Sequence, residues 1–137
     1  MKDQIGAESG EPSRPLTGVR LLLVEDEALV ALELEEMIIG LGAEVVGPFS
    51  RVSDALDALQ NGVTGAVLDV HLDGDTTFEV VDALLERGNP ILFVTGSALE
   101  LIPEKYRQLP RLHKPFEDGD FIRLIKSVFS EVKIRSE

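Results

Sequence analysis

Polar residues suited to phosphoryl chemistry follow four short apolar runs of this sequence. The runs are 19–24, 65–68, 91–94 and 109–113, and the residues that follow them are Glu25, Asp26, Asp69, Thr95 and Lys114. Parallel strands of an open sheet present such residues at their shared carboxyl edge. If the four runs are strands of one parallel sheet, three carboxylates, a hydroxyl and an ammonium lie along one edge. That set suits the binding of a phosphoryl group and a divalent metal ion.

The three carboxylates of this set need a positive partner. Left unpaired, Glu25, Asp26 and Asp69 would repel one another and raise one another's pKa. Mg²⁺ relieves this repulsion, because it binds through a few carboxylates while water and phosphate oxygens complete its shell. Lys114 adds a point charge for phosphate, and Thr95 adds a hydroxyl donor. An aspartate that closes an apolar strand also suits a nucleophile.

Each of these residues also has an ordinary structural interpretation. Glu25 and Asp26 could charge the first turn of a helix, where the macrodipole favours anions. Asp69 could cap a helix or loop, Thr95 could end a strand, and Lys114 could be a solvated charge. The conjunction of all five residues at the ends of strands favours a site over these separate interpretations.

Hydrophobic patterning predicts the framework that would position these residues. Strand-like runs lie at 19–24, 44–46, 65–68, 91–94 and 109–112, and helical patterns lie at 27–39, 50–61, 76–88 and 117–132. This alternation predicts an α/β protein with a doubly wound, five-stranded parallel sheet and five helices, two on one face and three on the other. The remaining helix, after residue 97, is expected to be short or broken because Pro103 follows so soon.

Local signals predict where several elements begin and end. Gly47-Pro48 should stop the second strand, and Ser50 should cap the second helix. Serine or threonine three residues before glutamate predicts capping boxes at 76–79 and 97–100. Residues 70–75 are expected to form an irregular loop.

Composition and charge limit the classes of protein that this chain can represent. It has 137 residues, 44% of them hydrophobic, and no cysteine, which suits one domain and excludes disulfides and thiolate metal sites. The net charge of −12 argues against a nucleic-acid partner.

No apolar run approaches the roughly 20 residues of a membrane helix, and no signal peptide is recognisable, so we expect a cytoplasmic protein with no membrane partner. Residues 1–17 are expected to be a flexible tail or a docking arm, 18–132 the folded domain, and 133–137 a second tail.

The motifs, taken in this order and spacing, resemble those of a known family. They are the sequence Leu-Leu-Leu-Val-Glu-Asp-Glu at 21–27, the aspartate after Val67-Leu68, Val94-Thr95-Gly96 and Lys114-Pro115-Phe116. Together they resemble the receiver domain of two-component response regulators, over residues 18–132. The resemblance implies a flavodoxin-like sheet with the strand order 2-1-3-4-5.

The resemblance also implies a role for each residue. Asp69 would accept a phosphoryl group from a phosphohistidine on a sensor histidine kinase or a histidine phosphotransfer protein. Thr95 and Lys114 would contact the phosphoryl oxygens. The ligands of Mg²⁺ would be Glu25, Asp26, Asp69 and the backbone carbonyl of His71. The chemistry would be limited to self-catalysed phosphotransfer and autodephosphorylation, so the chain would not be an enzyme acting on another substrate.

Several positions depart from the common receiver pattern. The loop 70–75 lacks the usual proline, and Arg111 stands where an aromatic switch residue is common, so we expect switching to run through residues 96–104. The sequence 90–96 is similar to a receiver subgroup with a Phe-Ala-Thr-Gly signature, although Val94 replaces its alanine and Ala98 its tyrosine. That subgroup often lacks an output domain and often works with HWE-type kinases. We therefore expect a bacterial receiver without an output domain, acting on an effector protein or as a phosphate sink.

Other interpretations of the same residues remain open. Residues 69–74 echo the start of an EF-hand loop, but Val80 stands where its last glutamate ligand belongs. A phosphatase of the haloacid dehalogenase type would need a second aspartate at the position of His71. A phosphorylation-independent interaction module with the receiver fold is the third alternative.

His71 could tune the lifetime of the phosphoryl group or be an ordinary loop residue, and the Lys114-Pro115 bond could be trans or cis.

Overall fold

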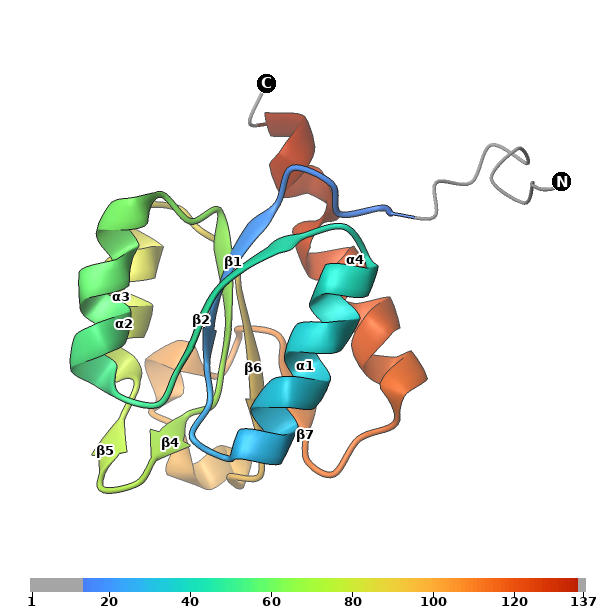
Figure 1. The fold of residues 1–137 in the computed structure, drawn as a ribbon. Coiled ribbons are helices and arrows are strands. Elements are labelled where there is room, and N and C mark those ends of the chain that lie inside the picture. Colours follow the sequence, from blue (N-terminus) through green and yellow to red (C-terminus); the bar gives the residue numbers. More distant parts are fainter. Residues whose placement is uncertain (1–13, 136–137) are drawn as a thin grey trace, which may run out of the picture.

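A five-stranded parallel sheet forms the centre of the molecule (Figure 1). The computed structural model describes residues 14–135. The strands are β1 (Arg20–Val24), β2 (Glu44–Phe49), β3 (Gly65–Leu68), β6 (Ile91–Thr95) and β7 (Arg111–His113). Their order across the sheet is β2-β1-β3-β6-β7, and each adjacent pair is parallel. This confirms the doubly wound sheet and the strand order that the sequence predicts.

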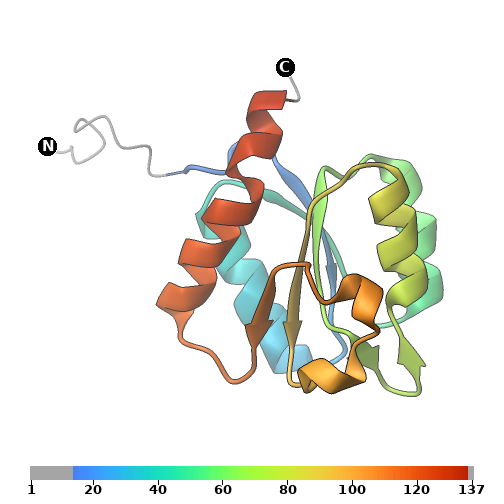
Figure 2. The same cartoon turned by 180° about the vertical axis from the view of Figure 1, so that it is seen from behind.

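Helices cover both faces of this sheet (Figures 1 and 2). On one face lie α1 (Ala28–Gly40) and α4 (Asp118–Arg135), and on the other lie α2 (Val52–Ala58) and α3 (Phe78–Glu86). The fifth predicted helix is replaced by two short 3₁₀ turns, η3 (Leu99–Leu101) and η4 (Glu104–Tyr106), with Pro103 between them. Ile102 and Tyr106 are buried with the α2 and α3 core, so these turns lie on that face. The expectation of a short or broken element after residue 97 is confirmed, but the described chain has four α-helices, two on each face, rather than the predicted five. A third 3₁₀ turn, η2 (Leu59–Asn61), extends α2.

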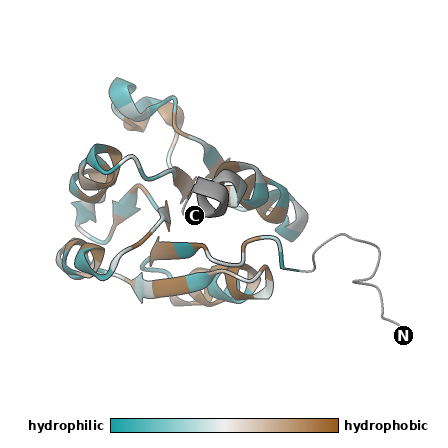
Figure 3. Ribbon diagram, turned by 90° about the horizontal axis from the view of Figure 1, so that it is seen from above, coloured by the Kyte–Doolittle hydropathy of each residue, from teal (hydrophilic) through white to brown (hydrophobic). Residues whose placement is uncertain are grey.

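The central strands supply side chains to two separate cores. In β1, Leu22 faces the core beneath α2 and α3, whereas Leu21 and Leu23 face the core beneath α1 and α4. All four residues of β3 are buried. A strand that is covered on both faces needs apolar residues at every position, which explains the unbroken apolar runs of the sequence. Figure 3 shows the helices on both sides of the strands from above.

Several predicted boundaries are wrong at the level of single residues. Strand β2 does not stop at Gly47-Pro48 but continues through a cis Gly47-Pro48 peptide bond to Phe49. Because β2 is an edge strand, its proline can lack an amide donor without breaking the sheet. The N-cap residues of α2, α3 and η3 are Arg51, Thr77 and Ala98, none of which makes a side-chain capping bond, so the caps expected at residues 50, 76 and 97 do not form.

The loop expected at 70–75 is more regular than its sequence predicts. It contains a short antiparallel hairpin of β4 (His71–Leu72) and β5 (Asp75–Thr76), with Gly74 at a positive φ in the turn. The hairpin lies beside the carboxyl ends of the central strands (Figure 1).

The described chain extends beyond both expected domain limits. Leu16, which the sequence analysis assigned to a flexible tail, is fully buried, and its amide donates to the Leu41 carbonyl at 2.9 Å. At the other end α4 continues to Arg135 instead of stopping at residue 132. The rest of the two predicted tails, 1–13 and 136–137, lies outside the described residues. None of the helices in the described part of the chain is long and apolar enough to cross a membrane.

Substituting Gly65 tests the packing of β3 against α4. A Cβ atom at this position would lie 2.7 and 2.9 Å from two ring carbons of Phe129, which is fully buried. We expect Gly65→Ala to lower the free energy of unfolding by about 1–3 kcal/mol, because a rigid buried ring must move. Urea denaturation measures the change. The matched control is Gly40→Ala, whose Cβ would meet no atom within 4 Å; equal stability of the two variants would contradict the prediction.

Candidate functional site

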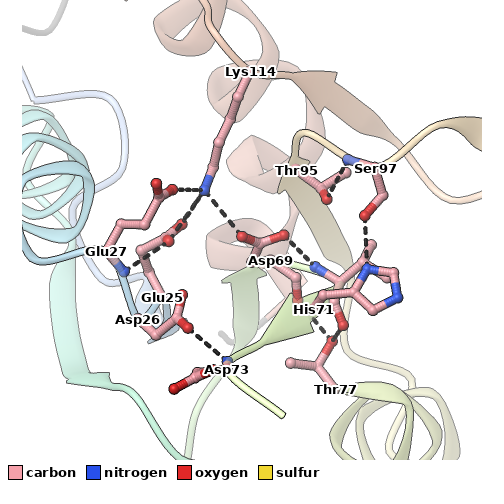
Figure 4. A network of polar contacts seen from close by, with 11 residues as sticks. Glu25, Asp26, Glu27, Asp69, His71, Asp73, Thr77, Thr95, Ser97 and Lys114 are labelled. Carbon is pink, nitrogen blue, oxygen red and sulfur yellow. Dashed lines mark hydrogen bonds and ion pairs between the residues drawn. The ribbon is translucent and has the colours of Figure 1, made fainter. Parts of the chain in front are cut away.

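The ammonium of Lys114 lies among three carboxylates at the carboxyl edge of the sheet (Figure 4). Its Nζ atom is 2.6 Å from Glu27 Oε1, 2.9 Å from Asp69 Oδ2 and 3.0 Å from Glu25 Oε1. Lys114 directly follows β7, its amide donates to the Thr95 carbonyl at 2.9 Å, and its bond to Pro115 is cis. The lysine thereby joins groups from three strand ends.

Burial and ion pairing act in opposite directions on these groups. Burial alone would lower the pKa of Lys114, but its hydrogen bonds to Glu27, Asp69 and Glu25 outweigh that effect and raise the pKa above its usual value. Burial raises the pKa of Glu25, and its bonds from Lys114 and from the Glu27 amide only partly offset this. Folding therefore favours the charged form of the lysine and disfavours the carboxylate form of Glu25.

Hydrogen bonds from both backbone and side-chain groups hold Asp69 in place. Its amide donates to the Val24 carbonyl at 3.0 Å, and its own carbonyl accepts a bond from Thr77 Oγ1 at 2.7 Å. One carboxylate oxygen, Oδ1, accepts from the Val70 amide at 2.7 Å, and the other accepts from Lys114. Although Asp69 is only 7% exposed, it lines two clefts.

The acidic cluster consists of Glu25, Glu27 and Asp69. Each offers an oxygen within 4.8 Å of the other two. With Lys114, the four groups carry a formal charge of −3 + 1 = −2, which a divalent cation would neutralise. Glu25 Oε1 is buried and has no hydrogen-bond partner among the described residues, although Lys114 lies within ion-pair distance. A buried oxygen without a donor, in a cluster of hard carboxylates, fits a small divalent metal ion.

Asp26 lies outside this cluster. Its Oδ2 atom accepts a bond from the Asp73 amide at 2.7 Å, which connects the end of β1 to the β4–β5 hairpin. The sequence analysis placed Asp26 rather than Glu27 beside the other acids. Beyond the end of a strand, no periodic pattern fixes the direction of each side chain. The sequence therefore could not show whether Asp26 or Glu27 joins the acidic cluster.

Thr95 and its neighbours form the opposite wall of the site. Thr95 is fully buried, and its hydroxyl accepts a bond from the Ser97 amide at 3.1 Å. The Ser97 hydroxyl lies 2.7 Å from His71 Nδ1, which joins β4 to the segment after β6 (Figure 4). The sequence analysis treated Ser97 as a helix cap, and only the fold brings it to His71, 26 residues away.

Two open clefts reach Asp69. One, of about 920 Å³, lies between the start of α1, residues 95–98 and residues 114–116. The other, of about 810 Å³, lies between Asp26, Arg51 and the β4–β5 hairpin. Glu27, Asp69 and His71 line both clefts. A group bound to Asp69 can therefore be approached from two sides.

Comparison with known proteins shows where this arrangement belongs. No protein-family model matches the chain. It is 28% identical to the phyllosphere-induced regulator PhyR of Methylorubrum extorquens, over 86% of this chain and 46% of that protein. The solved structure of SdrG from Sphingomonas melonis Fr1 is 31% identical with a TM-score of 0.70, covering 88% of this chain and 98% of SdrG. SdrG is a response-regulator receiver. This chain belongs to the receiver family.

A second solved structure agrees with this assignment. The response regulator PhyR from Brucella abortus is 28% identical with a TM-score of 0.75, covering 96% of this chain and 56% of that one. The receiver described here thus spans about half the length of the PhyR proteins that it matches. The receiver interpretation is confirmed at the level of the family. A strand, β3, precedes residues 69–74 where an EF-hand would have a helix, so the EF-hand interpretation is wrong.

The receiver brings most of the predicted site residues together. Glu25, Asp69 and Lys114 are in direct contact, and Thr95 lines the same cleft as Asp69 and Lys114. Asp26 and His71 line the second cleft with Asp69. Sequence analysis missed the contacts that three further residues make with this set, because each contact joins separate segments of the chain. These residues are Glu27, Ser97 and Thr77.

Neutralising Glu25 should stabilise the metal-free receiver. Because its folded-state pKa lies above the usual value, folding penalises the carboxylate, and the penalty appears as pH rises above about 4.5. We expect Glu25→Gln to raise the free energy of unfolding by about 1 kcal/mol at pH 7 in a chelator, and by much less at pH 4. Urea denaturation at both pH values measures this. Glu36→Gln, an exposed change of equal charge, should stay near wild type; an unstable Glu25→Gln variant at pH 7 would count against the prediction.

Proposed function

We propose that this receiver is a phosphoacceptor, and that Asp69 takes a phosphoryl group from a phosphohistidine. The observation that carries the proposal is the Asp69 carboxylate, held 2.9 Å from the Lys114 ammonium at the meeting point of two clefts. A carboxylate needs no deprotonation to act as a nucleophile. Its backbone contacts fix its position, and the adjacent cation can balance the charge that a phosphoryl group brings.

The transfer requires positioning and charge neutralisation more than covalent assistance. A carboxylate oxygen of Asp69 forms a bond to phosphorus as the phosphorus–nitrogen bond of the donor histidine breaks, and the imidazole leaves with the bonding electrons. Lys114 and Thr95 would contact the phosphoryl oxygens and stabilise their charge. Hydrolysis of the resulting acyl phosphate returns Asp69 to its free state. The chain would thus catalyse only its own phosphotransfer and dephosphorylation.

We propose that Mg²⁺ is the cation of this site. The residues that would hold it are Glu25, Asp26, Asp69 and the backbone carbonyl of His71. Support comes from the second cleft, which Asp26, Asp69 and His71 line, from the position of Glu25 on the same lysine as Asp69, and from the hard oxygen donors that Mg²⁺ prefers. When bound, the ion would supply positive charge beside the phosphoryl oxygens.

A protein partner follows from this chemistry. We propose a bacterial sensor histidine kinase, of the HWE type by the signature at 90–96, or a histidine phosphotransfer protein, as the donor in the cytoplasm. A PhyR from Bartonella quintana is described as an anti-anti-sigma factor, but it is 24% identical and this chain covers only 50% of it. For this receiver we propose an effector protein or a phosphate-sink role, with no nucleic-acid or membrane partner. The segment 96–104 would carry the change of conformation.

Intact mass measurement tests the phosphoacceptor proposal. Wild type should gain one phosphoryl adduct after incubation with Mg²⁺ and acetyl phosphate, and Asp69→Ala should gain none, because the nucleophile is removed. Chelator should abolish the wild-type adduct. No adduct on wild type, with Mg²⁺ binding shown separately, would favour the phosphorylation-independent interaction module.

The contact between His71 and Ser97 should lengthen the lifetime of the acyl phosphate. It closes one wall of the cleft beside Asp69, so its loss should admit water. We expect His71→Ala and Ser97→Ala each to dephosphorylate about fivefold faster, as the loss of one hydrogen bond supports. Decay of the phosphorylated mass measures this. His113→Ala is the control, since the other histidine is exposed at the end of β7. Equal rates in all variants would show that His71 is an ordinary loop residue.

A further inference from the structure

All three donors of the Lys114 ammonium are already engaged. A lysine ammonium has three N–H groups and no acceptor. In this structure they bond to Glu27 Oε1 at 2.6 Å, Asp69 Oδ2 at 2.9 Å and Glu25 Oε2 at 3.1 Å. If Lys114 is to contact a phosphoryl oxygen, as the proposed function requires, it must loosen one of these bonds.

The three partners differ in how easily they can leave. The side chain of Glu25 is 0% exposed and that of Asp69 is 10% exposed, whereas that of Glu27 is 61% exposed. A buried carboxylate that loses its cation is left without compensation, which is costly. An exposed one regains water, and surface ion pairs contribute little stability. Before phosphorus bonds to Asp69 and removes the charge of its carboxylate, Glu27 is therefore the partner that Lys114 can release at the lowest cost, although its bond is the shortest.

Glu27 also lies where its charge opposes an incoming anion. Its carboxylate is within 4.8 Å of the Asp69 carboxylate, and it lines both clefts through which Asp69 is reached. A phosphoryl group on Asp69 would bring further negative charge toward it. Glu27 and the phosphoryl group would both bond to Lys114, and their negative charges repel each other. Lys114 would therefore bond to one of them at a time.

We infer that Glu27 is a positioning residue whose carboxylate pairs with the Lys114 ammonium until a phosphoryl group replaces it. The release of this ion pair sets the rate of phosphorylation. This inference rests on the proposed function of Asp69 as phosphoacceptor. In the free receiver Glu27 neutralises the lysine and holds it at the acidic cluster. On phosphorylation its carboxylate moves to solvent, and the donor that it releases passes to a phosphoryl oxygen. Since Glu27 precedes the first residue of α1, its release also frees a contact between α1 and the segment after β7.

Kinetics with a small phosphodonor test this role. In the reaction, the phosphorus–oxygen bond of acetyl phosphate breaks as phosphorus bonds to an Asp69 oxygen, and acetate leaves with the electrons. We expect Glu27→Gln to be phosphorylated about fivefold faster than wild type at low salt, the size that one exposed ion pair supports. The advantage should shrink in high salt, because screening weakens the charge that Glu27 contributes. A purely structural role would not produce this dependence on ionic strength.

A matched variant and a second readout complete the experiment. Glu33→Gln removes an equal charge from the wall of the same cleft, but Glu33 is not among the carboxylate partners of Lys114. It should be phosphorylated within twofold of the wild-type rate. Beryllium fluoride with Mg²⁺, an analogue of the phosphoryl group, should bind to Glu27→Gln about fivefold more tightly than to wild type by calorimetry.

Each outcome separates this inference from the proposed function. If wild type forms the adduct and Glu27→Gln reacts no faster than wild type, the role of Glu27 is wrong and the phosphoacceptor function stands. If Glu27→Gln reacts more slowly, Glu27 assists the reaction, which also overturns the inference. If wild type forms no adduct and binds no beryllium fluoride, the proposed function fails and the inference fails with it.

Discussion

The rest of the site depends on the ion pairs between Lys114 and its three carboxylates. Glu25 and Asp69 are buried, and two buried acids side by side would repel each other and lose their hydration. A single ammonium bonds to both of them and to Glu27, but it leaves the three carboxylates with a formal excess of two negative charges. This excess negative charge supports the proposal that the site binds a divalent cation, which would in turn balance the charge of a phosphoryl group.

The sheet supplies the geometry that these ion pairs need. Parallel pairing of β1 with β3 sets Glu25 beside Asp69, and β6 and β7 then bring Thr95 and Lys114 to the same edge. Apolar residues on both faces fix the register, because a slip by one residue would exchange the two cores. The described ends of the chain lie at the opposite edge of the sheet (Figure 1).

Around this rigid edge lies a second set of contacts that join separate segments. Asp26 holds the β4–β5 hairpin, and His71 on that hairpin contacts Ser97. The segment 97–106 ends at Tyr106. The Tyr106 hydroxyl donates to Asp82 at 2.6 Å, and the Tyr106 ring stacks on Phe78. Arg111 stands where the common receiver pattern has an aromatic switch residue. These contacts support the proposal that the segment 96–104 carries a change of conformation when Asp69 is phosphorylated.

The sequence by itself determined the parallel sheet and the acceptor candidate Asp69, because unbroken apolar runs that end in polar residues are typical of parallel strands covered on both faces. The strand order came from the resemblance to receiver domains. It did not determine which of two adjacent acids joins the cluster, since the direction of Glu27 depends on Lys114, which is 87 residues away. Nor did it predict that β2 passes through Pro48, that Leu16 is buried, or that Ser97 contacts His71 rather than caps a helix. Local sequence patterns indicate whether a segment forms a helix or a strand and which of its faces packs against the core. Contacts between particular side chains from distant segments are decided only when the chain is folded.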